Sequence, residues 1–232
     1  MVTVSNQLYA PSSRLFIPQE KRVLNITALV SPTLLSEQEM GYLVRRRREI
    51  WGGYAHDDVP ALVGHIQERP GTIYIARLNG TSDSTDGIVG GLEIYKLQTH
   101  GDPKNIPPTA EEVRSNGDAK EPDTMLLFQF ESYDDSQRIR GQVTIETILY
   151  AIENFKQYPN LFTYSPKEAV RIHRRFGAVP VHVFPNGRRH HIDPHVVINS
   201  YWSETPLKGL TDQEIDEWVN GSLQNVPNVL AT

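Results

Sequence analysis

The sequence lacks cysteine, which excludes disulfides, thiolate metal sites, iron–sulfur ligation and a thiol nucleophile. It also lacks any run of about 20 apolar residues, the length that a membrane-spanning helix needs. Residues 1–10 lack the basic-then-apolar order of a secretory signal. Basic residues are few as well, since 23 Lys and Arg stand against 28 Asp and Glu, a formal net charge of -5. We therefore expect a cytoplasmic protein that binds neither membrane nor nucleic acid.

The composition is that of an ordinary globular protein, with 38% hydrophobic, 9% aromatic and 22% charged residues. A chain of 232 residues can bury a sizeable core in one domain. Prolines and polar residues over 1–20 predict an irregular arm, and one domain is expected over 21–232. The stretch at about 98–123 holds four prolines and few large apolar residues, so we expect a loop or insertion there that is able to cover a substrate.

One run of like charge, Arg45–Arg48, departs from the acidic balance. It lies inside a helical pattern, and consecutive residues of a helix point in different directions. The run therefore predicts a solvated face, with a phosphate or an acidic partner as the alternative.

Apolar periodicity predicts an alternation of strands and helices. Strands are expected at 23–30, 72–78, 88–97, 124–132, 161–164, 179–184 and 196–202. Helices are expected at 31–51, 59–67, 143–154, 165–176 and 211–220. Antiparallel strands followed by helix-linked strands predict an α/β fold with a mixed, mostly antiparallel central sheet and helices on both faces.

A polar hexapeptide follows the most apolar predicted strand and precedes a predicted helix. Backbone N–H groups at a helix N-terminus can bind a pyrophosphate, and a small residue such as Gly141 lets the phosphates approach closely. The hexapeptide resembles the Arg/Gln-x-x-Gly-x-Gly/Ala loop of the GNAT superfamily of acyl-CoA-dependent N-acyltransferases. Arg138 and Gly141 match it, and Val143 departs from it. The resemblance implies a coenzyme A site, with an ordinary helix start as the alternative. The residues concerned are Arg138, Ile139, Arg140, Gly141, Gln142 and Val143.

A second pattern lies at residues 165–178, where the superfamily carries Ala-x-x-x-Tyr-x-x-x-Gly-Phe. Ala169 and Gly177 match, and His173 stands where the family has a tyrosine that often acts as general acid. An imidazole has an unperturbed pKa of about 6.5, against about 10 for a phenol. His173 is therefore able to act as acid or base near neutral pH.

Three features near the C-terminus narrow the resemblance: His-x-x-x-Gly-Ala at 173–178, Pro-Asn-x-Arg at 185–188, and a strand that ends near Tyr201. They are similar to the GNAT-like domains that begin some polyketide synthases. Members of that group act on malonyl-type thioesters by decarboxylation, acyl transfer or both. The match covers the last third of the chain, whereas the first 120 residues or so match by element order alone.

The resemblance also implies a working set of Trp, Thr, His and Arg. By motif, the histidine is His173 and the arginine is Arg188. Trp51, after the first long helix, and Thr144, beside the phosphate loop, are the candidates for the other two positions. A packing aromatic and a hydroxyl near a helix N-terminus are the alternatives for Trp51 and Thr144.

The chemistry can also be argued from the residue types. Decarboxylation of a malonyl thioester places charge on the thioester oxygen, which a hydrogen-bond donor such as His173 stabilises, while a cation such as Arg188 orients the carboxylate. Transfer to an amine needs a base as well, and Glu131 on the strand before the loop is the candidate. The alternatives are a carboxylate paired with an arginine for Glu131 and a core imidazole for His173.

The sequence thus predicts an enzyme that transfers an acyl group from coenzyme A or an acyl carrier protein to a small-molecule acceptor, in secondary-metabolite biosynthesis. Malonyl decarboxylation, another reaction on a polyketide-like intermediate, and a non-catalytic GNAT-like binding module are the alternatives. No metal is expected, because Pro194 interrupts the spacing of His191, Asp193 and His195 in a predicted surface loop.

Overall fold

The computed structural model describes residues 21–51, 58–81, 85–117, 119–133, 137–185 and 195–223. For residues 51, 86, 137–140 and 221–223 it describes the backbone alone. The predicted arm over 1–20 lies outside the described residues.

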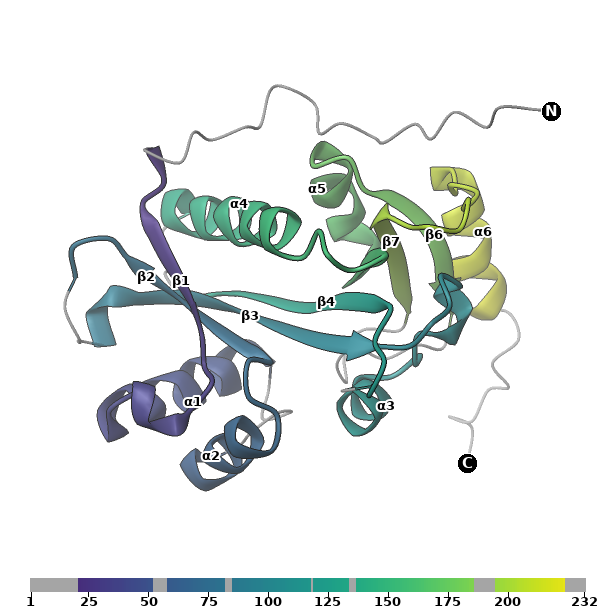
Figure 1. Ribbon diagram of the computed structural model, residues 1–232. Helices are drawn as coiled ribbons and strands as arrows, with labels where there is room; N and C mark the ends of the chain where they lie inside the picture. The colour runs from purple at the N-terminus through teal and green to yellow at the C-terminus, as the bar shows by residue number, and fades with distance from the viewer. Residues whose placement is uncertain are drawn as a thin grey trace, which may run out of the picture.

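A seven-stranded sheet runs through the described part of the chain (Figure 1). Its strands are β1 (Leu24–Ala28), β2 (Ile73–Leu78), β3 (Ile88–Leu97), β4 (Thr124–Ser132), β5 (Asn160–Ser165), β6 (Val179–Phe184) and β7 (Val196–Trp202). They lie in the order β1-β2-β3-β4-β5-β7-β6, and every neighbouring pair is antiparallel except β4 with β5. The predicted mixed, mostly antiparallel sheet is confirmed.

Helices cover both faces of this sheet, as predicted. They are α1 (Glu37–Trp51), α2 (Val59–Glu68), α3 (Ala110–Asn116), α4 (Gln137–Asn154), α5 (Val170–Arg175) and α6 (Asp212–Leu223). Figure 1 shows α4 and α5 on one face and α1, α2 and α3 on the other. A hydrophobic cluster fills the layer under α4, and two further clusters fill the layers under α1 and α2 and under α3.

Local capping explains where the first helices begin. Ser36 and Glu39 form a capping box at the start of α1: the Ser36 N–H donates to the Glu39 carboxylate at 2.8 Å, and the Glu39 N–H donates to Ser36 Oγ at 3.3 Å. Ser31 caps only a short 3-10 turn, Pro32–Leu34, so the prediction that the helix begins there is wrong. Asp58 caps α2 by accepting from the Ala61 N–H at 2.8 Å.

The stretch expected to be a loop contains regular structure. It holds a 3-10 turn at Pro103–Asn105 and the helix α3. Thr109 and Glu112 form a complete capping box, and Ala110 and Val113 are buried in the core. Two apolar residues on one face of a short, well-capped helix are enough to dock it on the sheet.

The helix α4 begins six residues earlier than predicted, at Gln137 rather than at residue 143. The hexapeptide Arg138–Val143 therefore forms the first turns of the helix and not a loop that precedes it. The first four N–H groups of a helix have no acceptor within it, so the groups available to an anion belong to the beginning of this segment. No acidic residue lies in that first turn.

A β-bulge divides β4 into two parts with different neighbours. Ile94 pairs with Leu127 and Glu93 pairs with Gln129, which leaves Phe128 as the extra residue. The pairing of β4 with β5 ends at the same point, at Leu127 and Thr163. Bulges bend a strand and increase its twist. The rest of β4 therefore follows β3 alone and parts from β5.

Helix α4 approaches the sheet closely at Gly90 on β3. A Cβ atom at Gly90 would lie 2.3 Å from the Glu131 carbonyl oxygen and 2.5 Å from Val143 Cγ1. Val143 is 1% exposed, so its side chain fills the space that glycine leaves. The contact fixes the distance between the start of α4 and the divided strand.

We expect Gly90→Ala to destabilise the protein by about 1–3 kcal/mol, because the added methyl group meets a backbone oxygen that cannot move freely. The free energy of unfolding in urea measures this. Gly64→Ala in α2 is the matched control, since a Cβ there meets nothing within 4 Å. That change should stabilise the protein by about 0.5–1 kcal/mol. Equal effects of the two changes would contradict the close approach.

Candidate functional site

The predicted catalytic histidine lies in a buried polar pair. His173, on α5, is 4% exposed, and its Nδ1 atom lies 2.8 Å from the hydroxyl oxygen of Tyr201 on β7. Tyr201 is the extra residue of a second bulge, between the pairs Leu161–Trp202 and Phe162–Ser200. The bulge places Tyr201 and Trp202 on the same face, where both pack with the cluster under α4.

The hydrogen bond indicates which nitrogen of His173 carries the proton. Burial raises the pKa of the Tyr201 phenol above its usual range, so the phenol stays protonated at neutral pH. A buried hydroxyl needs an acceptor for its proton. Among the described residues, the acceptor that Tyr201 reaches is His173 Nδ1. The phenol therefore donates to Nδ1, and a neutral His173 carries its own proton on Nε2 as a hydrogen-bond donor.

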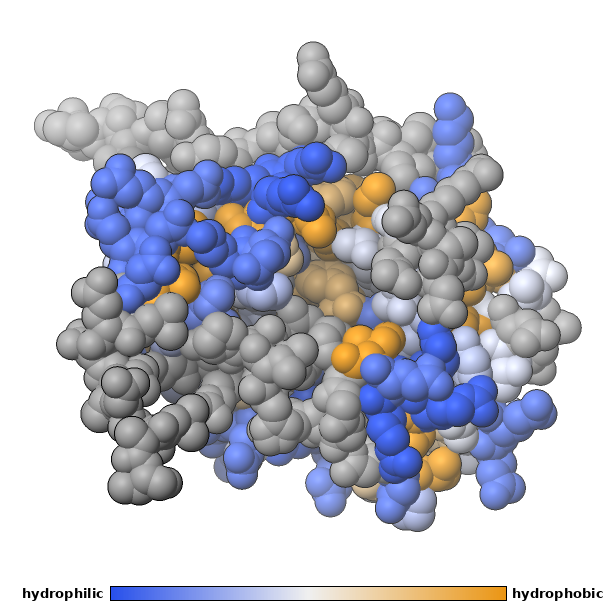
Figure 2. Space-filling model, turned by 180° about the vertical axis from the view of Figure 1, so that it is seen from behind, coloured by the Kyte–Doolittle hydropathy of each residue, from blue (hydrophilic) through white to orange (hydrophobic). Residues whose placement is uncertain are grey.

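The His173 ring also faces the part of β4 that has left β5. Its centroid lies 5.8 Å from that of Phe130, which is half-buried and lies beyond the last pair, Leu127 with Thr163. Figure 2, the view from behind, shows a hollow near the middle of the molecule, with hydrophobic side chains at its bottom and hydrophilic ones beside it. Apolar walls with a few polar groups are typical of small-molecule sites.

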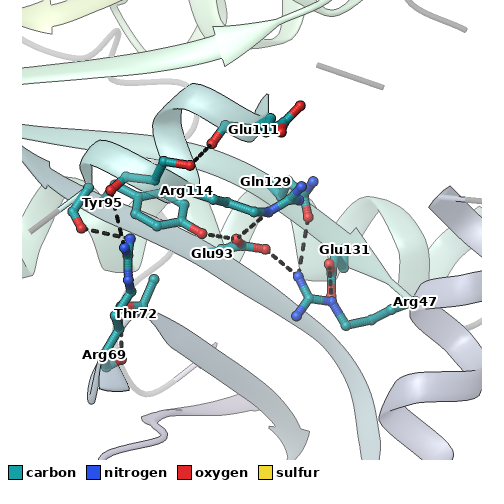
Figure 3. Close-up of polar contacts among 11 residues, drawn as sticks. Arg47, Arg69, Thr72, Glu93, Tyr95, Glu111, Arg114, Gln129 and Glu131 are labelled. Carbon is teal, nitrogen blue, oxygen red and sulfur yellow. Dashed lines mark hydrogen bonds and ion pairs between the residues drawn. The ribbon is translucent and has the colours of Figure 1, made fainter. Parts of the chain in front are cut away.

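A buried ionic cluster occupies the opposite face of the sheet (Figure 3). Arg47, from α1, donates through Nη2 to Glu93 on β3 and through Nε to Glu131 on β4, the latter at 2.8 Å. Its Nη2 also donates to the Gln129 amide oxygen at 3.2 Å. The side chains of Arg47, Glu93 and Glu131 are at most 2% exposed. The predicted solvated face of the arginine run is therefore wrong for Arg47.

The carboxylates around Arg47 hold its guanidinium in the ionised state. Burial opposes the charge of Arg47, but the carboxylates of Glu131 and Glu93 outweigh it and raise the pKa of the guanidinium. Arg114, on α3, adds a second cation at 3.5 Å from Glu93. Such a cluster is stable only while it is complete, because a lone buried charge costs several kcal/mol.

Both oxygens of Glu131 are engaged in this cluster. Oε1 accepts from Arg47, and Oε2 accepts from the Tyr133 hydroxyl. Burial, followed by the Glu131 charge, raises the pKa of Tyr133 well above its usual range. Phe130 and Glu131 are successive residues on opposite faces, so the predicted base and His173 lie on different sides of the sheet.

The described residues of the predicted phosphate segment point in three directions. Gly141 is exposed, and a Cβ there would meet nothing within 4 Å. Gln142 donates to the buried Glu146, which accepts from the start of β1, and Val143 packs on Gly90. Thr144 is half-buried about two turns into α4, where its carbonyl oxygen accepts from the Thr147 hydroxyl at 3.1 Å.

Other predicted site residues fall outside the described part of the chain. Arg188 lies outside the described residues altogether. Trp51 is the last residue of α1, and Arg138, Ile139 and Arg140 are in the first turn of α4, but their side chains are not among those described. Their roles stay predictions.

Sequence reasoning missed residues of both the His173–Tyr201 pair and the ionic cluster around Arg47. Tyr201 was expected only as the end of a strand, and its bond to His173 depends on a bulge. Glu93 did carry a signal, since it is the one acidic residue in the apolar segment 88–97. A carboxylate on a buried strand requires a buried cation, and the nearby arginine run could have supplied it.

Within the described ranges, no group of three or more His, Asp or Glu side chains could hold a metal ion. None of the described helices combines the length and the apolar character needed to cross a membrane.

No protein-family model matches the sequence, and no curated protein matches it. Solved structures do match. The loading GNATL domain of CurA from Lyngbya majuscula aligns with a TM-score of 0.56 and 13% identity, over 77% of this chain and 96% of that domain. The GphF GNAT-like decarboxylase in complex with isobutyryl-CoA aligns with a TM-score of 0.54 and 12% identity, over 76% of this chain and 97% of the other. The chain therefore has the GNAT fold, as its motifs predicted.

We expect Arg47→Met to destabilise the protein by about 3–5 kcal/mol, because it leaves Glu93 and Glu131 buried without their shared cation. Urea unfolding measures the change. Arg45→Met is the matched control: Arg45 is exposed and lies over the Tyr42 ring at 5.5 Å, so its loss should cost less than about 1 kcal/mol. Adding Glu131→Gln to Arg47→Met should restore part of the loss. No recovery would contradict the charge argument.

Proposed function

We propose that this protein is an enzyme that transfers an acyl group from a thioester, of coenzyme A or an acyl carrier protein, to a small-molecule acceptor. The observation that carries the proposal is the His173–Tyr201 pair, which gives His173 an Nε2–H donor beside the segment of β4 that has left β5. The GNAT fold supports it, because one similar domain is a loading domain and another was solved with isobutyryl-CoA.

In the transfer reaction the acceptor attacks the thioester carbonyl carbon, and the carbon–sulfur bond breaks. The Nε2–H of His173 donates a hydrogen bond to the departing sulfur, which leaves as a thiol once it takes, through water, the proton that the acceptor releases. Tyr201 holds the imidazole in the required tautomer and orientation through Nδ1. The acceptor releases its own proton to water, because Glu131 is engaged with Arg47 and Tyr133.

Malonyl-thioester decarboxylation is the second candidate, and the state of Glu131 favours it. Decarboxylation breaks the bond to the carboxylate, releases carbon dioxide and leaves an enolate that takes a proton from water. It needs a hydrogen-bond donor at the enolate oxygen but no base to activate an acceptor. A neutral His173 with Nε2–H supplies such a donor. The resemblance to a structure titled as a decarboxylase agrees with this candidate.

The remaining residues of the predicted set keep their proposed roles. Arg188 would orient the malonyl carboxylate, and Trp51 and Thr144 would line the acyl site. The N-terminus of α4 would bind the pyrophosphate through its first N–H groups, where the absence of acidic residues and the open space at Gly141 suit an anion. A role in secondary-metabolite biosynthesis follows from the same resemblance and is part of the proposal.

The proposal predicts that the purified protein binds acetyl-CoA or malonyl-CoA in calorimetry and that His173→Ala lowers turnover about 10²–10⁴-fold. Mass spectrometry of the thioester separates transfer from decarboxylation. His173→Gln keeps an N–H donor, so it should retain more of either activity than His173→Ala does. Tyr201→Phe should lower the rate about tenfold, since it removes one orienting hydrogen bond.

Two variants control for changes in packing. Tyr150→Phe removes a phenol hydroxyl from the same hydrophobic cluster, and His100→Ala removes an imidazole whose side chain is 73% exposed. Both should keep the wild-type rate. No heat and no thermal shift with either thioester would exclude both reactions on coenzyme A thioesters and favour a non-catalytic module. An unchanged rate in His173→Ala would exclude the mechanism. Another reaction on a polyketide-like intermediate would then be the remaining candidate.

We expect Gly141→Ala to weaken coenzyme A binding by fivefold or more while leaving the fold intact. A Cβ at Gly141 meets no protein atom within 4 Å, so in the protein alone alanine should stabilise α4 by about 0.5–1 kcal/mol. Calorimetry and thermal unfolding measure the two effects. Gly41→Ala in α1, which also has open space, should show the stabilisation without the loss of affinity. Unchanged affinity in Gly141→Ala would place the pyrophosphate elsewhere.

A further inference from the structure

A second cavity lies at the outer edge of the sheet, beside β6. Its volume is about 470 Å³, within the range of small-molecule sites. Its apolar walls are formed by residues of β6, of the segment between β7 and α6, of α6 and of the turn before α3: Val181, Val183, Leu207, Leu210, Trp218 and Pro103. Since β6 is the last strand in the sheet order, two strands separate it from β4, where His173 faces Phe130.

The walls of this cavity are held by local contacts. Gly101 lies against Thr205 so closely that a Cβ at Gly101 would meet the hydroxyl oxygen at 2.4 Å. The Leu210 N–H donates to the Pro180 carbonyl oxygen at 2.7 Å, which ties the segment before α6 to β6. Asp102 caps the turn Pro103–Asn105 by accepting from the Lys104 N–H. These contacts hold the walls of the cavity in place.

Two aromatic rings, set at 65° to each other, line the cavity. Trp218 is 48% exposed, the only tryptophan among the exposed large hydrophobic residues in the described part of the chain. Its ring lies 6.2 Å from that of His182, which in turn packs edge-on against Phe184 at 4.4 Å. Burial, and then Lys104, lowers the pKa of His182, so the imidazole is neutral near pH 7. A planar apolar ligand can stack on the exposed indole of Trp218 and meet the edge of the His182 ring.

The charges at the cavity leave one cation available. Lys208 pairs with Glu214 at 2.8 Å. The carboxylate of Asp102 is engaged in capping. Lys104 forms no ion pair with any residue that the structure describes, and it lies near enough to His182 to affect its charge. An anionic group of a ligand would therefore find its partner in Lys104.

We infer that this cavity is a binding site, separate from the His173 site, for a flat apolar molecule that bears one carboxylate. The apolar part would lie against Trp218 and His182, and the carboxylate would pair with Lys104. The inference rests on the cavity, its aromatic wall and its cation, and it stands whether or not the protein acts on thioesters.

Calorimetry with 2-naphthoate and its neutral analogue 2-naphthamide tests the inference on the full chain. The wild type should bind 2-naphthoate at one site and at least fivefold more tightly than the amide. Lys104→Met should remove this preference and leave the affinity for the amide unchanged. Trp218→Ala should weaken both ligands at least tenfold. The matched control, Lys120→Met, changes an exposed lysine away from the cavity and should alter neither affinity.

Thermal unfolding checks that the variants are folded, which the exposure of Trp218 and Lys104 favours. Saturating acetyl-CoA should not displace 2-naphthoate, because the two sites are separate. Equal affinity of the wild type for the two ligands, full binding by Trp218→Ala, or competition with acetyl-CoA would overturn the inference. Failure to bind any thioester would contradict the proposed function and leave this site untouched.

Discussion

The parting of β4 from β5 is the constraint on which the rest of the structure depends. Beyond Phe128, β4 keeps its ladder with β3 but pairs with no strand on its other side within the part of the chain that the structure describes. A strand in that position is secured by side chains rather than by backbone pairing. On one face, Arg47 of α1 donates to Glu93 on β3 and to Glu131 on β4, and so fixes both strands to the helix. On the other face, Val143 of α4 packs on Gly90 of β3.

The two faces of the divided strand carry different chemistry. On the side of α4 and α5, a histidine oriented by a tyrosine faces an aromatic ring. On the side of α1 and α3, the charges are many but are satisfied by one another. A group whose charge is already neutralised contributes more to the position of the backbone than to proton transfer. We therefore interpret Glu131 as support for the strand and His173 as the reactive group.

Most of the fold could be predicted because the spacing of apolar residues in each strand indicates which of its side chains are buried. Strands β3, β4, β6 and β7 have the predicted bounds, and the order of the predicted elements is that of the structure. The start of α4 was missed because residues 137–142 include a single large apolar residue, Ile139, and so lack helical periodicity. Helix α3 was missed because its prolines and charges masked a Thr109–Glu112 capping box. In both cases the local signal was polar, whereas the prediction relied on apolar spacing.

The site was harder to predict than the fold because the His173–Tyr201 pair and the ionic cluster around Arg47 both depend on β-bulges. In a regular strand, successive side chains alternate between faces, so a sequence assigns each residue to a side. The bulge at Phe128 puts Phe128 and Gln129 on the same face, and the one in β7 does the same for Tyr201 and Trp202. One extra residue reverses the assignment of all those that follow. Reactive side chains therefore gather where the sheet departs from the alternation that makes the rest of it predictable.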